Sequence, residues 1–498
     1  MSIHWPIIRS LLASPSRVLI VDDRRSYRGI EILVGAMHVA AYLAPRVQAQ
    51  TLGLLLPTSG AFPIAALAGW ILGKTIVPIN YLLKPEEMRY VIDDCGCDTV
   101  LTAQPMLEYL GAHADECLRA ASGGPKGVEH VVRMEDIGFE GVPEPIRPAT
   151  PDEDDLGVLL YTSGTSGRPK GVMLTHANIA TNVRQVRDWA QFTRADVMLG
   201  VLPQFHSFGL TVQTLLPLSH GIRVVYTARF VPQRLVKLIR EHRPTVFIAV
   251  PSMYGALLSV KDAGPEDFAS LRYAVSGGEP LPDGVSSRML ERFGVRLNEG
   301  YGLTETAPVT NWCRPHEFRP HSVGRALGGV VERIVDPGGR ELPAGVDGEV
   351  QIKGPNVMRG YYHLPDQSRG AFTADGYLKT GDMGRFDADG HLYITGRIKE
   401  MLIIAGENVF PREIEEVLNR HESIKDSGVI GQMDTLRGEI PVAFVELREG
   451  ATFDEQALKA WCRRSLAQYK VPDRIACLPE LPRNPTGKIM RRELKKLL

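Results

Sequence analysis

Short apolar runs alternate with longer segments of helical periodicity through the first 300 residues. The strand-like runs lie at 17–22, 51–56, 75–79 and 99–102, and again at 197–203, 246–251 and 272–281. The helical apolar faces lie at 30–43, 62–72 and 231–241. Strands that alternate with helices predict an α/β fold of mostly parallel sheets with flanking helices.

The pattern changes at about residue 320. From there to 396, short strand-like runs are separated by turns rich in Asp and Gly, which predict a small β-rich subdomain. Residues 397–498 return to mixed strand and helix patterns and end in a basic tail. About 100 residues is enough for an autonomous small domain. We therefore expect an N-terminal domain at 1–396, with the β-rich subdomain at about 320–396, and an α+β C-terminal domain at 397–498.

Length and composition narrow the possible functions. The chain has 498 residues, of which 44% are hydrophobic and 23% charged, so it is globular and too long for one core. A net charge of −1 gives no reason to expect binding to nucleic acid or to an anionic membrane. The six cysteines are scattered, which is typical of reduced thiols.

The apolar stretch 61–73 ends at Lys74, too short for a transmembrane segment, and the N-terminus lacks a signal-peptide pattern. A soluble, cytoplasmic protein is expected.

The first candidate for chemistry is the loop YTSGTSGRPKGV at 161–172. It follows a strand-like run at 156–160 and precedes a segment from Met173 that is predicted to begin a helix. Glycines, clustered hydroxyls and a lysine can cradle a polyphosphate. The candidate residues are Thr162, Ser163, Gly164, Thr165, Ser166 and Lys170. A flexible surface hairpin is the alternative interpretation. The lysine follows proline and precedes glycine, so this is not a Walker-type P-loop.

A second candidate element is NEGYGLTET at 298–306. Tyr301 can stack on adenine, Thr304 can donate to an α-phosphate, and Glu305 is a hard oxygen ligand suited to Mg²⁺. The two elements together resemble the signatures of the adenylate-forming superfamily of AMP-binding enzymes, which includes acyl-CoA synthetases such as fatty-acid–CoA ligases. The resemblance covers the chain from about Ser26 onward. It implies ATP, Mg²⁺ and coenzyme A as cofactors, and it adds Glu299, Gly300 and Gly302 to the nucleotide-binding candidates.

Two glycine-containing turns supply further nucleotide contacts. SGGEPL at 276–281 follows a strand, and its glycines let a flat base approach the backbone; an ordinary β–α turn is the alternative. Its candidate residues are Gly277, Gly278, Glu279 and Pro280. Asp382 in YLKTGDMG can accept both ribose hydroxyls and Arg397 can add a second contact, with a surface salt bridge as the alternative. In the resembling family these two positions hold the ribose.

The resemblance also assigns the remaining candidates. His206, in LPQFHSFGL, would gate the acyl and thiol tunnels, although a lone histidine among apolar residues is more often a core residue. Lys399 corresponds to the hinge between the domains, and Gly406 would line the channel for pantetheine. Lys488, in NPTGKIMRREL, corresponds to the catalytic lysine; a solvated basic helix is the alternative for this tail. The family's small domain rotates about the hinge between two half-reactions, so a mobile C-terminal domain is expected.

The sequence also indicates the kind of acid. Amino-acid-activating relatives place Asp directly after the phenylalanine of this motif, because a buried ammonium group needs a carboxylate partner. Here that position is His206, and the following TVQTLLPL contains no acid. We therefore expect a fatty or other apolar carboxylic acid, joined to AMP and then to coenzyme A. The alternatives are a ligase that loads a separate acyl carrier protein, and a non-catalytic acyl-adenylate binder. An oxidative, light-emitting side activity is also compatible with the motifs.

Overall fold

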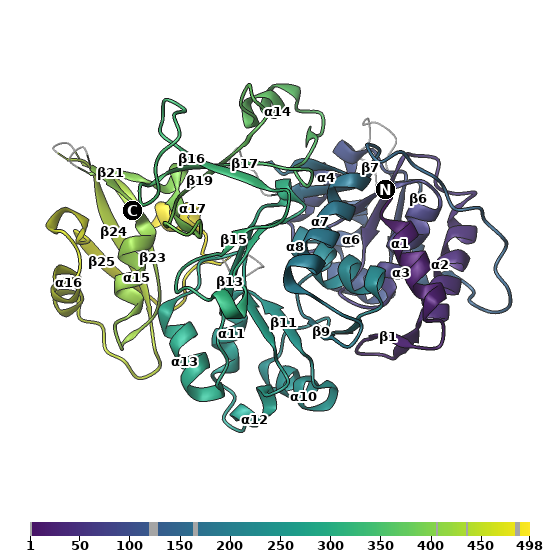
Figure 1. Ribbon diagram of the computed structural model, residues 1–498, viewed down its shortest axis with the longest axis horizontal. Coiled ribbons are helices and arrows are strands. Elements are labelled where there is room, and N and C mark those ends of the chain that lie inside the picture. Colours follow the sequence, from purple (N-terminus) through teal and green to yellow (C-terminus); the bar gives the residue numbers. More distant parts are fainter. Residues whose placement is uncertain (1, 119–127, 163–167, 405–406, 435–436, 484–488) are drawn as a thin grey trace.

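The computed structural model describes residues 2–118, 128–162, 168–404, 407–434, 437–483 and 489–498. Figure 1 shows two large sheets with flanking helices, a smaller sheet beside them, and a separate sheet near the C-terminus. The α/β architecture predicted from the alternating pattern is confirmed.

The first sheet has seven strands and carries the predicted phosphate loop. In order across the sheet, its strands are β18 (Gly360–Tyr361), β8 (Lys170–Thr175), β7 (Leu156–Thr162), β4 (Thr75–Pro78), β3 (Thr51–Leu55), β5 (Thr99–Thr102) and β6 (His130–Arg133). Strands β7, β4, β3, β5 and β6 are parallel, and β8 and β18 complete one edge in antiparallel fashion. The helices in this part of the sequence are α1 (His4–Ala13), α2 (Gly29–Leu43), α3 (Ala61–Ile71), α4 (Pro85–Cys95), α5 (Gln104–Leu110), α6 (His113–Leu118) and α7 (His176–Ala190).

The segment after the phosphate loop differs from its prediction. A helix was expected from Met173, but β8 continues to Thr175 and pairs with β7, with Thr162 opposite Lys170. The helix α7 begins only at His176, where the Thr175 hydroxyl accepts a hydrogen bond from Asn178 N and caps the helix. The loop therefore connects the two strands of an antiparallel hairpin rather than a strand and a helix.

The second sheet has nine strands. In order, they are β15 (Arg325–Ala326), β14 (Val309–Trp312), β13 (Asn298–Gly302), β12 (Tyr273–Ser276), β11 (Val246–Ala249), β9 (Val197–Gly200), β10 (Arg223–Tyr226), β1 (Val18–Val21) and β2 (Ser26–Arg28). The strands from β13 to β1 run parallel, so their carboxyl ends lie along one edge. The helices of this region are α8 (Ser207–Leu210), α9 (Leu216–His220), α10 (Pro232–His242), α11 (Pro251–Leu257), α12 (Pro265–Phe268) and α13 (Asp283–Phe293).

The two remaining sheets are smaller. An antiparallel sheet contains β16 (Val331–Val335), β17 (Gly348–Lys353), β19 (Leu378–Phe386) and β20 (Leu392–Arg397), with α14 (Pro365–Ala371) between its strands in sequence. The C-terminal sheet contains β22 (Glu407–Val409), β21 (Leu402–Ile404), β24 (Gly438–Leu447), β23 (Ile424–Asp434) and β25 (Arg474–Leu478). Its helices are α15 (Pro411–Asn419), α16 (Glu455–Arg463) and α17 (Arg491–Leu494).

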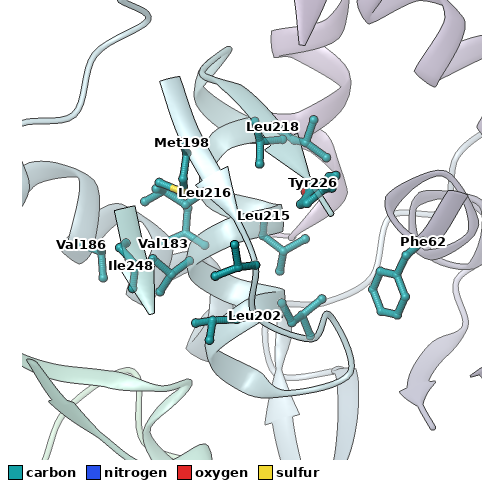
Figure 2. Close-up of a cluster of buried hydrophobic side chains, with 14 of the residues drawn as sticks. Phe62, Val183, Val186, Met198, Leu202, Leu215, Leu216, Leu218, Tyr226 and Ile248 are labelled. Atoms are coloured by element: carbon teal, nitrogen blue, oxygen red, sulfur yellow. The ribbon is translucent and has the colours of Figure 1, made fainter. Parts of the chain in front are cut away.

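The apolar cores on the two sides of Arg397 are separate. One cluster runs from Ile3 to Leu392 and joins both large sheets to the antiparallel sheet, and another contains buried residues between Leu402 and Ile475. Figure 2 shows part of the first, where side chains of α7, β9 and the helical stretch around Leu215 meet. Each fully buried aliphatic side chain of this kind contributes about 1.5–3 kcal/mol. Leu202, a member of this cluster, lies in the turn between β9 and α8 that carries His206.

Within the described part of the chain, every helix is too short or too polar to traverse a bilayer.

Candidate active site

Nine of the fourteen predicted nucleotide-binding residues that the structure describes line one cleft of about 890 Å³. The cleft lies where the ends of β12 and β13 face β19, β20 and the C-terminal part of the chain. The predicted residues on its wall are Gly278, Glu279, Pro280, Glu299, Gly300, Tyr301, Gly302, Asp382 and Arg397. They come from segments spread between positions 278 and 397 of the sequence. The fold brings them together at the carboxyl edge of a parallel sheet, where ligands bind in α/β proteins.

Asp382 is the polar centre of this wall. Its Oδ2 accepts a 2.6 Å hydrogen bond from the Tyr301 hydroxyl, and its Oδ1 lies 2.8 Å from Arg397 Nε. Burial, with the neighbouring carboxylate adding to it, raises the pKa of the Tyr301 phenol, so this group stays a donor. The same carboxylate raises the pKa of Arg397. The arrangement presents a carboxylate in a fixed orientation to the cleft.

Glu299 contributes a buried carboxyl to the same wall. Burial raises its pKa to about 7, although the positive charge of Arg412 acts in the opposite direction. Its backbone oxygen accepts a hydrogen bond from Cys313 N, which ties β13 to the strand after it. A carboxyl with this pKa is partly protonated at neutral pH and can donate as well as accept a hydrogen bond.

A second group of candidates surrounds Glu305. Its Oε1 accepts a 2.9 Å hydrogen bond from the Tyr361 hydroxyl, and Lys170 Nζ lies 4.9 Å from the centre of the Tyr361 ring. The Thr304 and Ser207 hydroxyls are within 3.3 Å of each other. Sequence reasoning missed Tyr361, because an uncharged residue in an edge strand carries no signal of its own. Tyr361 therefore contacts both Lys170, at the end of the phosphate loop, and Glu305, the predicted metal ligand.

His206 lies at the start of α8 and is half-buried, with its Nε2 atom shielded from solvent. Burial lowers its pKa to about 4, so the imidazole is neutral at physiological pH. Its ring lies 4.6 Å from that of Phe205, and among the described residues its Nε2 has no hydrogen-bond partner. Nearby, a Cβ at Gly277 would lie 3.1 Å from the Phe208 ring, so this glycine allows the β12 turn to approach α8. Both interpretations of His206, core residue and gate, fit a buried and neutral ring.

Several predicted residues cannot be placed. Ser163, Gly164, Thr165, Ser166, Gly406 and Lys488 lie outside the described residues. Lys399 is described: it is exposed in the short helical turn η5 (Ile398–Glu400) that directly follows β20, and it is not part of the cleft wall. The turn η5 leads from the antiparallel sheet into the C-terminal sheet.

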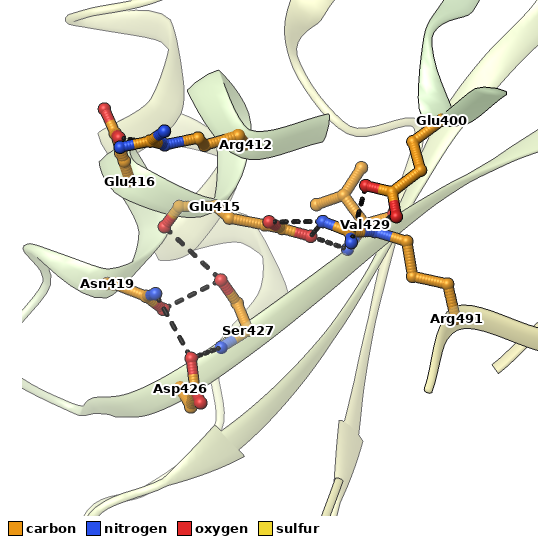
Figure 3. A network of polar contacts seen from close by, with 9 residues as sticks. All are labelled: Glu400, Arg412, Glu415, Glu416, Asn419, Asp426, Ser427, Val429 and Arg491. Atoms are coloured by element: carbon orange, nitrogen blue, oxygen red, sulfur yellow. Dashed lines mark hydrogen bonds and ion pairs between the residues drawn. The ribbon is translucent and has the colours of Figure 1, made fainter. Parts of the chain in front are cut away.

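A network of charges from the C-terminal part closes the other wall of the cleft (Figure 3). Both oxygens of the Glu415 carboxylate lie 2.7 Å from Arg491 Nη2, and Arg491 Nη1 lies 2.8 Å from Glu400. Burial raises the pKa of Glu415, while the charge of Arg491 acts to lower it. These residues were not predicted, since their charges looked like those of any solvated helix or basic tail.

The residues around Glu305 fit a divalent cation shared with phosphate. The Tyr361 hydroxyl holds its Oε1, which leaves Oε2 to face a metal. The described residues contain no cluster of three or more His, Cys, Asp and Glu side chains suited to a metal. Mg²⁺ in nucleotide sites typically uses only one or two carboxylates together with phosphate oxygens and water, which a single glutamate satisfies.

The chain is similar to known ligases over nearly its whole length. A family model described as AMP-binding enzyme matches residues 9–362, and one described as AMP-binding enzyme C-terminal domain matches residues 413–488. A sulfoacetate–CoA ligase of Cupriavidus necator is 36% identical over 472 residues, 93% of this chain and 89% of that protein. A long-chain-fatty-acid–CoA ligase of Bacillus subtilis is 39% identical over 354 residues, 70% of this chain and 62% of that protein. ATP-bound MatB from Rhodopseudomonas palustris superposes with a TM-score of 0.89 at 30% identity, covering 100% of this chain and 99% of that one.

Proposed function

Since the chain belongs to the AMP-binding enzyme family and is an AMP-forming acid–thiol ligase, we propose that its acid is a fatty or other apolar carboxylic acid and that the cleft beside Asp382 binds ATP. The observation that carries the proposal is the convergence of residues 278–280, 299–302, 382 and 397 on one wall. In this assignment the ring of Tyr301 faces adenine, and Asp382, fixed by its two partners, accepts the ribose hydroxyls.

The first half-reaction joins the acid to AMP. A carboxylate oxygen attacks the α-phosphorus of ATP, the bond from that phosphorus to the bridging oxygen breaks, and pyrophosphate leaves with the electron pair. The residues of the protein position the reactants and neutralise charge. Thr304 would donate to the α-phosphate, and Lys170 and Lys488 would face the phosphates. Mg²⁺, which Glu305 would hold, supplies charge neutralisation on the phosphate oxygens when it is bound.

The second half-reaction transfers the acyl group to a thiol. The thiolate sulfur of coenzyme A attacks the acyl carbonyl carbon, and AMP leaves with the electrons of the mixed-anhydride bond. Lys488 would then obstruct the thiol, and we propose that the C-terminal domain rotates about Lys399 and brings the face with Gly406 inward. Among the described residues, none from β21 or β22, which flank Gly406, lines the cleft. The observed arrangement is thus assigned to the first half-reaction.

The chemistry around His206 favours an apolar acid. The imidazole is neutral because burial lowers its pKa to about 4, so it offers no charge to a second anionic group. Its neighbours Phe205 and Leu210 are buried and apolar. An acid with two negative charges, such as sulfoacetate, needs a cationic partner for the second charge when it is taken out of water.

ATP–pyrophosphate exchange across a panel of acids tests this proposal. The panel contains saturated acids of graded length, aryl acids such as 4-coumarate, and sulfoacetate. We expect exchange with one or more apolar acids and none with sulfoacetate. Preference for sulfoacetate would overturn the apolar assignment while leaving the ligase chemistry intact. Absence of exchange with every acid, in the presence of bound ATP, would favour a non-catalytic binder.

The identity of the thiol needs a second assay. The ligases to which the chain is similar are named for coenzyme A, which supports this acceptor. We expect AMP release to depend on coenzyme A with saturable kinetics. A requirement for an acyl carrier protein in place of coenzyme A would instead support the carrier-loading alternative.

A further inference from the structure

We propose that Tyr361 is a positioning residue that fixes the Glu305 carboxylate and the Lys170 ammonium relative to each other. The Mg²⁺ ion at Glu305 and the phosphate at Lys170 then bind in a fixed relative position. The inference rests on the proposed function, in which Glu305 faces Mg²⁺ and Lys170 faces the phosphates. Nothing in the local sequence GYYHLP at 360–365 suggests this role.

The first contact is between the phenol and the carboxylate. The Tyr361 hydroxyl donates to Glu305 Oε1 at 2.9 Å, and both side chains are partly buried. A hydrogen bond to a charged acceptor in such surroundings is stronger than one between neutral groups. Because Oε1 accepts this hydrogen bond, Oε2 is the oxygen that remains for a metal ion. The hydrogen bond fixes the orientation of the carboxylate and therefore the direction in which Oε2 points.

The second contact is between the ring and the lysine. Lys170 Nζ lies 4.9 Å from the centre of the Tyr361 ring, within the range of a cation–π interaction. The phenol thus contacts an anion through its hydroxyl and a cation through its face. Through these two contacts, one side chain relates the position of the Glu305 carboxylate to that of the Lys170 ammonium.

The backbone around Tyr361 is held on both sides. Met358 N donates to Glu305 O at 2.8 Å, and Tyr362 N donates to Gly171 O at 2.7 Å. Tyr361 itself pairs with Val172 in β8, and its N–H donates to Ser368 Oγ at 2.8 Å. The segment 358–362 therefore connects the strand that ends the phosphate loop to the turn that carries Glu305.

Gly171 makes this close approach possible. A Cβ at this position would lie 3.0 Å from Leu159, 3.1 Å from the Tyr161 ring and 3.2 Å from Tyr362 Cβ. A side chain at position 171 would require these neighbours, including Tyr362 next to Tyr361, to shift by a few tenths of an ångström. The position of the phenol is thus set by backbone contacts that do not depend on the ligand.

The test is a calorimetric titration of the protein with α,β-methylene-ATP, which cannot be cleaved at the reacting bond, with and without Mg²⁺. Tyr361→Phe removes only the hydroxyl. We expect it to weaken binding with Mg²⁺ by about tenfold, the effect of one hydrogen bond to a charged group, and to leave binding without Mg²⁺ unchanged. Tyr361→Leu also removes the ring, and we expect it to weaken metal-free binding by a further factor of about two to five.

Two controls separate the possible outcomes. Tyr362→Phe removes a hydroxyl from the neighbouring ring, which stacks on His363 at 3.8 Å, and it should match the wild type in both titrations. In a Glu305→Gln background, Tyr361→Phe should have no further effect. Wild-type affinities for Tyr361→Phe, with Mg²⁺-dependent binding lost in Glu305→Gln, would overturn the inference and leave the proposed function standing. Full Mg²⁺-dependent binding in Glu305→Gln would instead overturn the metal assignment of the proposed function, and the inference with it.

Discussion

The Tyr301 hydroxyl donates a 2.6 Å hydrogen bond to Asp382 Oδ2 across 81 positions of sequence. Arg397 holds the other oxygen of the same carboxylate at 2.8 Å. Both oxygens are therefore oriented before a nucleotide enters, which lowers the entropy lost on binding. The hydrogen bond from Tyr301 also connects the end of β13, in the nine-stranded sheet, to β19 in the antiparallel sheet. The same contact therefore contributes to the relative position of the two sheets and to the geometry of the site.

Removal of the hydrogen bond between Tyr301 and Asp382 should weaken ATP binding more than it slows the reaction. Tyr301→Phe keeps the ring but leaves Oδ2 of Asp382 without its donor. We expect the KM for ATP to rise by about tenfold, since one charge-assisted hydrogen bond is lost, with a smaller change in kcat. Pyrophosphate exchange at varied ATP concentration measures both constants. Tyr393→Phe is the matched control, because the Tyr393 hydroxyl donates to Asp387 at 3.4 Å and neither residue lines the cleft.

Gly302 should tolerate no side chain. A Cβ there would lie 2.1 Å from Pro308 O, a backbone atom that cannot rotate away. Gly302→Ala should displace the end of β13 and reduce ATP binding by at least tenfold, as measured by calorimetry. Gly370→Ala, in α14, is the control: a Cβ there has no atom within 4 Å, and alanine should stabilise the helix by up to about 1 kcal/mol. If Gly302→Ala and Gly370→Ala bound ATP with the same affinity, this account of Gly302 would be wrong.

The sheets were predictable because their strands are short apolar runs separated by helical periodicity. β3, β5, β11 and β12 fall inside the runs expected for them. The error at β8 has a physical reason: Val172, Met173 and Leu174 suit a helix as well as a strand, and only pairing with β7 decides between the two. A local pattern carries no information about that partner.

The candidate site was predictable only where a residue's own chemistry stands out. Asp382 and Glu299 were singled out by their motifs, and both line the cleft. Tyr361 was not, because its role arises from contacts with Glu305 and Lys170 that exist only in the folded chain. The same holds for Arg491, whose pairing with Glu415 cannot be read from a basic tail.

An ion pair across the cleft should influence the balance between the half-reactions. Arg420, at the end of α15, lies 2.6 Å from Asp283 at the start of α13. The pair is partly exposed and is worth up to about 1 kcal/mol, or a factor of about five. Arg420→Ala should therefore slow adenylation by up to about fivefold and should not slow acyl transfer from supplied acyl-AMP. Arg437→Ala is the control, since its partner Asp473 lies in the same C-terminal part. Added salt should reproduce the effect in the wild type; a salt-independent rate would count against the ion pair.

The buried carboxyl of Glu299 should make stability depend on pH. Burial raises its pKa from an ordinary 4.5 to about 7, so between these values the folded state keeps a proton that the unfolded state releases. The contribution of Glu299 to the free energy of unfolding should therefore fall as the pH rises from about 4.5 to 7 and stay level above it. Gln cannot ionise, so Glu299→Gln should match the wild type near pH 4.5 and exceed it by up to about 3 kcal/mol at pH 8.

Urea unfolding curves at intervals between pH 4.5 and pH 8 measure this difference. Glu422→Gln, which replaces an exposed carboxyl outside the cleft wall, is the matched control. Glu332 is a second buried carboxyl whose pKa burial raises to about 7, so its own contribution to the slope should survive in Glu299→Gln and be lost in the double variant. A constant difference between Glu299→Gln and the wild type across this range would mean that Glu299 is ionised throughout. The carboxylate would then have to be compensated by Arg412, the cation whose charge acts against burial at this site.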